Sequence, residues 1–131
     1  MDTTTNTPPR WQIWTGRVVS ALTAVPMLMA AAMNFARTQQ ALDGMKQFGY
    51  PESAVLTVGI LASLAVVLYI IPRTAVLGAI VMTGYFGGAI ATHIRISDPG
   101  WPAALVCGIL TWLGLYLRDA RLRALLPLRR P

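Results

Sequence analysis

Four apolar stretches, separated by short polar connections, dominate the chain. They cover residues 14–33, 54–71, 74–94 and 102–117. Each is close to the ~20 residues that an α-helix needs to cross ~30 Å of hydrocarbon. Only Arg17 and His93 interrupt them with a basic side chain, and both lie near an end, where they can reach the interface. The pattern predicts an all-α membrane protein, an antiparallel bundle of four transmembrane helices in one domain.

Two other interpretations of this pattern are less consistent with it. A water-soluble helix keeps one polar face, whereas residues 54–71 carry no charge on any face. The first stretch also resembles a cleavable signal peptide, because arginines precede it and three alanines end it. That interpretation would leave three spans. The length of the stretch and Pro26 in its middle favour a retained helix.

A short amphipathic helix is predicted between the first two spans. Apolar side chains recur there at helical spacing, with charged side chains between them: Ala41, Leu42, Met45 and Phe48. Such a segment lies in the plane of the interface, with its apolar face toward the lipid. We expect it on the outer side of the membrane.

The basic residues predict the orientation. The net charge is +6, from eleven Lys and Arg against five Asp and Glu. If the termini share a side, that side holds eight of the eleven, and the other holds three, namely Arg37, Lys46 and Arg95. The positive-inside rule then places both termini in the cytoplasm, at the inner membrane. The charges serve topology here, so no nucleic-acid partner is predicted.

The two ends of the chain are polar. Residues 1–10 form a polar N-terminal tail, and residues 118–131 form a tail with five arginines and one aspartate. Anionic lipid attracts basic residues near its surface by ~1 kcal/mol each. The bilayer is therefore the first partner expected for the basic tail.

The sequence predicts no catalytic residue and no metal site. Cys107 and His93 are the only residues of their kinds, so neither a disulfide nor a usual metal-ligand set can form within the chain. The five carboxylates all fall in predicted loops or tails. No paired buried acids and no Ser-His-Asp arrangement can be assembled from them.

A polar pocket is nevertheless conceivable at the outer end. Its predicted lining is Asn34, Tyr85, Thr92, His93 and Arg95. Buried ionisable groups in membranes usually have a partner or a function. His93 would handle a proton or bond a quinone, or these side chains would simply hydrogen-bond the helices together.

One helix face is predicted to pack closely against a neighbour. The third predicted helix has a face of small residues, formed by Gly84, Gly88 and Ala91. Small residues at this spacing allow a neighbouring backbone to approach. The fourth predicted helix has one face formed by Cys107, Thr111, Gly114 and Arg118.

Several motifs resemble the DoxX-like family of small four-helix membrane proteins. They are IPRTAVLGAI at 71–80, TGYFGGAIATHIR at 83–95, FGYPE at 48–52 and GLYLRD at 114–119. The resemblance runs from about residue 17 to residue 127 and implies a four-helix bundle. Some relatives are named for a thiosulfate:quinone oxidoreductase subunit, and others are tied to membrane-associated oxidative-stress complexes.

The chain departs from the pattern of these relatives at polar positions. Relatives often have an acidic residue and a lysine near the end of the first helix, where this chain has Ala30 and Asn34. Others carry a glutamate in the second helix, where Ala62 or Ser63 stands here. An ion pair or proton carrier built from those groups cannot operate in this protein.

Three functions follow as hypotheses, in this order. The first is a non-enzymatic binding or assembly module for a partner protein or for a small apolar ligand, such as a quinone or a lipid. The second is a membrane subunit of a quinone-linked oxidoreductase, with His93 and Tyr85 bonding the quinone. The third is a small transporter, which would need to be a homo-oligomer because each chain supplies four spans.

Overall fold

A computed structural model describes residues 7–125 and shows only helices among them. Residues 1–6 and 126–131, which include parts of both predicted tails, lie outside the described residues. The six helices are α1 (Arg10–Phe35), α2 (Gln39–Gln47), α3 (Ala54–Ile70), α4 (Ala75–Arg95), α5 (Trp101–Arg118) and α6 (Ala120–Leu125).

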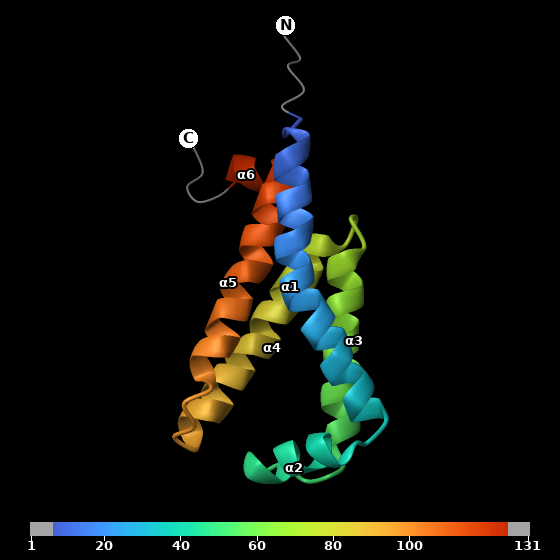
Figure 1. Ribbon diagram of the computed structural model, residues 1–131, viewed down its shortest axis with the longest axis vertical. Helices are drawn as coiled ribbons and strands as arrows, with labels where there is room; N and C mark the ends of the chain where they lie inside the picture. Colours follow the sequence, from blue (N-terminus) through green and yellow to red (C-terminus); the bar gives the residue numbers. More distant parts are fainter. Residues whose placement is uncertain (1–6, 126–131) are drawn as a thin grey trace, which may run out of the picture.

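The four long helices form a ring. Each packs closely against two neighbours, in the order α1, α3, α4, α5 and back to α1, and no Cα–Cα distance within a diagonal pair is 8 Å or less. Figure 1 shows that the helices converge at the end where α1 begins and α5 ends. Toward the other end, α1 and α3 separate from α4 and α5, and α2 lies across that end. The two ends are therefore built differently, and we call them the converging end and the α2 end.

Three helices are long and apolar enough to cross a membrane: α1, α4 and α5. Helix α3 is also apolar but has 17 residues, the lower limit for a span. Large apolar side chains such as Val18, Ile80 and Ile109 are more than half exposed. Backbone groups bonded within helices and apolar side chains directed outward suit a lipid environment. The prediction that α3 completes a four-span antiparallel bundle stays a prediction.

Helix bounds differ from the predicted ones mainly at the ends of the chain. Helix α1 begins at Arg10 instead of residue 14, and α6 occupies part of the predicted basic tail. Hydropathy detects only the apolar part of a helix, so the polar first turn after Pro9 was missed. The helix continues through Pro26 and bends in its middle (Figure 1), as a proline inside a helix produces.

Small residues bring the helices together. A Cβ on Gly78 of α4 would lie 2.2 Å from the backbone nitrogen of Tyr69 in α3. A Cβ on Gly114 of α5 would lie 2.4 Å from the hydroxyl oxygen of Ser20 in α1. These two glycines allow backbones to approach as no other residue would.

The face of small residues predicted on α4 points elsewhere. Gly84, Gly88 and Ala91 are exposed, and a Cβ added at Gly84 or Gly88 would meet nothing within 4 Å. No helix within residues 7–125 packs against Gly84 or Gly88. The predicted close packing of this face would therefore require a second molecule, and it stays a prediction.

Candidate functional site

A groove of about 1210 Å³ opens at the converging end of the bundle. Its walls come from α1, from the connection between α3 and α4, and from α5 and α6. It follows one face of α1 from Ile13 to Leu28. At 1.5 Å per residue this face is ~22 Å long. This groove is our candidate site.

The wall toward the middle of the bundle is apolar. It is formed by Ala21, Ala24, Val25, Leu28 and Ile70. The two alanines leave room beside α1, and the larger side chains border that room. This part of the groove suits hydrocarbon.

The floor holds a buried tyrosine whose hydroxyl bridges three helices. Tyr69 is 1% exposed, and its hydroxyl donates to the backbone carbonyl of Thr111 at 2.7 Å. Since this uses its single proton, Ser20 donates to the tyrosine oxygen, at 2.9 Å. The tyrosine thus links α3 to α1 and α5 and fixes the groove floor.

Arg118 of α5 packs against the end of α3 in the groove. Its Nη2 donates to the backbone carbonyl of Tyr69 at 3.1 Å, and its guanidinium lies 4.8 Å from the centre of the tyrosine ring. The last carbonyls of a helix have no partner within the helix, and a cation is favourable there. Its Nε is buried and has no hydrogen-bond partner among the described residues.

The α3–α4 connection is held by a second cap. The Thr74 hydroxyl donates to the backbone carbonyl of Leu68 at 2.8 Å, which satisfies another carbonyl at the end of α3. The connection places Pro72 and Arg73 in the groove wall, and Ala75 at the start of α4 follows them there. A tight turn therefore positions one basic side chain in the groove wall.

The rim of the groove is basic. Its lining contains four arginines, Arg17, Arg73, Arg118 and Arg121, and one carboxylate, that of Asp119. The Asp119 Oδ1 accepts from the backbone amide of Arg121 at 2.8 Å, as a cap of α6. The ion pairs seen among residues 7–125 involve Glu52 and Asp98 only, both toward the α2 end. Among residues 7–125, the groove therefore carries an excess of positive charge.

Three residues of the predicted pocket gather at the α2 end, against the chain that leaves α2. His93 Nδ1 bonds the carboxylate of Asp98, and its ring lies edge-on to Phe48 with the centroids 4.8 Å apart. Arg95 donates to the backbone carbonyl of Phe48. Thr92 shares a hydrogen bond with the Tyr50 hydroxyl at 2.9 Å. Together these contacts tie α2 to the end of α4.

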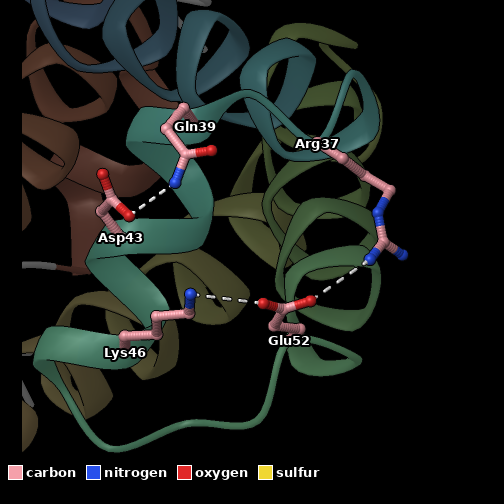
Figure 2. Close-up of polar contacts among 5 residues, drawn as sticks. All are labelled: Arg37, Gln39, Asp43, Lys46 and Glu52. Atoms are coloured by element: carbon pink, nitrogen blue, oxygen red, sulfur yellow. Dashed lines mark hydrogen bonds and ion pairs between the residues drawn. The ribbon is translucent and has the colours of Figure 1, made fainter.

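The geometry of α2 explains why Phe48 and Tyr50 reach α4. Thr38 caps the start of the helix by accepting from the amide of Ala41 at 3.3 Å. The helix ends at Gln47, and Gly49, two residues later, has a φ of 75°, the left-handed conformation that glycine favours at this position. Figure 2 shows the ion pairs at its flanks, from Arg37 and Lys46 to Glu52.

The other two predicted pocket residues lie apart from this group. Asn34 is buried on α1, against Gly59 of α3, and α1 is not a neighbour of α4 in the ring. Tyr85 stacks edge-on with Phe86, two turns of α4 away from His93. The structure thus brings together Thr92, His93 and Arg95 but neither Asn34 nor Tyr85 with them.

The groove contains residues that sequence reasoning overlooked. Tyr69 and Ser20 both lie inside long apolar runs, where hydropathy gives them no weight. One signal was present: Thr111, Gly114 and Arg118 share a face of α5, and this face turns inward. A small, polar and basic face on an apolar helix indicates the side that meets the bundle.

The side chains that line the groove are suited to noncovalent binding. Within the part of the chain that the structure describes, no three His, Cys, Asp or Glu side chains are grouped to hold a metal ion. The groove offers arginines, two hydroxyls and an apolar wall. Binding sites for small molecules typically combine an apolar wall with a few polar groups of this kind.

The long apolar helices define a helical integral membrane protein. A comparison with protein families shows which family the chain belongs to. The family model described as DoxX-like matches residues 18–114, so the chain belongs to the DoxX-like family. The match covers α1 from residue 18 to its end, all of α2, α3 and α4, and most of α5. No curated protein and no solved structure matches the chain.

Proposed function

We propose that this protein is a non-enzymatic membrane module that binds a small, largely apolar molecule in the groove at the converging end. The observation that carries the proposal is the groove itself, about 1210 Å³, with an apolar wall and a polar floor. Ligand sites are typically concave, mostly apolar and supplied with a few fixed polar groups.

The floor supports this proposal because it is preorganised. The Tyr69 hydroxyl is held by bonds to Ser20 and Thr111, and Arg118 is held against the tyrosine. Fixed polar groups lose little conformational freedom when a ligand arrives. The proposal places the ligand at this end rather than beside His93, which is already bonded to Asp98.

The experiment compares two tryptophan substitutions on α1. Ala21 is exposed and lines the groove, whereas Ala30 is exposed on the opposite side of the same helix. We expect Ala21→Trp to fill the groove and to remove a small molecule that co-purifies with the wild type. Ala30→Trp should retain it.

Mass spectrometry of extracted and of intact protein gives the readout and identifies the bound molecule. Equal retention by both variants, or a wild type that never retains a small molecule, would contradict the proposal. A bound quinone would favour the quinone-linked hypothesis, in which a partner protein supplies the redox centre. Homo-oligomeric and partner-protein roles stay predictions.

A further inference from the structure

We infer that the groove recognises the phosphate head group of an anionic phospholipid, with its acyl chain along the apolar wall. This inference rests on the proposed function and names the ligand class. It assigns the head group to Arg17, Arg73 and Arg118, which line the groove together. The acyl chain would follow Ala21, Ala24, Val25 and Leu28.

Charge is the first argument. Four arginines and one carboxylate line the groove, and the carboxylates that form ion pairs within residues 7–125 lie toward the α2 end. Arginine presents a planar set of donors that matches phosphate oxygens. An anionic ligand would compensate the positive charge, whereas a neutral ligand would leave it unchanged.

The order of polar and apolar groups along α1 is the second argument. Arg17 lies near the converging end, Ser20 follows one turn later, and the apolar lining continues to Leu28. From Ser20 to Leu28 the helix rises ~12 Å, close to the ~15 Å of hydrocarbon in one leaflet. A basic end joined to an apolar wall of that length matches a phospholipid better than a free anion.

The depth of the basic groups is the third argument. Arg118 bonds the carbonyl at the end of α3, and Arg73 stands in the α3–α4 connection. Helix ends of this kind lie at the level of the lipid head groups. The arginines are therefore placed where a phosphate of the same leaflet would be.

The test measures lipid binding to the purified full-length protein in mild detergent at about 0.15 M salt, by native mass spectrometry. The probes are phosphatidylglycerol, phosphatidylcholine with matched acyl chains, and soluble glycerol 3-phosphate. We expect phosphatidylglycerol to bind at least about tenfold more tightly than the other two. Glycerol 3-phosphate carries the phosphate without the acyl chains, so it separates a free anion from a lipid.

The variants are Arg17→Gln and Arg73→Gln, alone and combined. Neither side chain makes a hydrogen bond seen among the described residues, although Arg17 stacks over Trp14 at 5.2 Å. We expect each substitution to weaken phosphatidylglycerol binding about fivefold, and the pair about 25-fold. Arg10→Gln is the matched control, since Arg10 begins α1 but does not line the groove, and it should change binding less than about twofold.

Arg118→Gln is measured as a second variant, with its thermal stability, because Arg118 also caps α3. The inference is overturned if phosphatidylcholine binds as tightly as phosphatidylglycerol, if glycerol 3-phosphate binds as tightly, or if the double variant matches Arg10→Gln. A neutral molecule that Ala21→Trp displaces would overturn this inference and leave the proposed function standing. Absence of any retained or added ligand would overturn both.

Discussion

Gly78 is the position where one added methyl group should disturb the bundle most. A Cβ there would lie 2.2 Å and 2.4 Å from the Tyr69 backbone nitrogen and Cα, and 2.6 Å from the carbonyl carbon of Leu68. All three atoms belong to backbone, so no side-chain rotation can relieve the overlap. Ordinary contact begins at 3.4 Å, and the two helices would have to separate by about 1.2 Å at this point.

The magnitude follows from two opposing terms. Overpacking a well-packed interior costs ~1–3 kcal/mol, and a backbone overlap belongs at the upper end of that range. Alanine in place of glycine in a helix gains ~1 kcal/mol. We therefore expect Gly78→Ala to lower the free energy of unfolding by ~2 kcal/mol. Gly84→Ala on the same helix meets nothing within 4 Å, so it should raise that free energy by up to ~1 kcal/mol.

The assay is equilibrium unfolding in mixed micelles with increasing dodecyl sulfate, followed by tryptophan fluorescence. Light scattering confirms that both variants are compared in the same oligomeric state. The substitution also displaces Tyr69, so Gly78→Ala should weaken ligand binding in the groove as well. A Gly78→Ala protein as stable as the wild type, or a Gly84→Ala protein that is the less stable of the two, would refute the packing argument.

Three further predictions test the groove floor, the topology and the α2 end. Tyr69→Phe should lower the free energy of unfolding by ~1 kcal/mol. In a double-mutant cycle with Ser20→Ala, the two effects should be non-additive because Tyr69 and Ser20 share one hydrogen bond. Full additivity would disprove that coupling. In a Cys107→Ser background, an impermeant thiol reagent should label Ser97→Cys only from outside the cell and Thr7→Cys only from the cytoplasm; the reverse pattern would invert the predicted orientation. His93→Ala should speed amide hydrogen exchange in α2 and at Tyr50, because the ring of His93 packs on Phe48. Asp43→Asn is the control, since the Asp43 side chain bonds only within α2 (Figure 2), and it should leave exchange at Tyr50 unchanged. Equal exchange rates in both variants would contradict the proposed role of His93 in holding the chain after α2 against α4.

The short helix between the first two spans illustrates what local sequence can predict. Its apolar positions recur at helical spacing, and α2 forms there, over Gln39–Gln47. Its exact partners could not be predicted the same way. The contacts of Phe48 and Tyr50 with α4 depend on a turn at Gly49 and on the direction of a helix far along the chain.

The polar pocket shows where depth alone misleads. Asn34 and His93 were named as lining one hypothetical pocket because both lie near the same end of their helices, with hydrogen bonding between helices as the alternative. Two residues at the same depth in the membrane can meet only if their helices are also neighbours. In the ring α1 neighbours α3 and α5, so Asn34 meets Gly59 and not α4.

By itself the sequence determined that the chain is helical and belongs in lipid. Hydrocarbon offers no hydrogen bonds, so long apolar runs must satisfy their backbone groups internally. Tertiary structure alone decided which side of each helix faces its neighbours. Helices such as α3 are apolar all round, and lipid is as apolar as the bundle interior, so hydropathy cannot distinguish the buried Tyr69 face from the exposed one. Close backbone approach at Gly78 and Gly114 selected that face, and with it the groove.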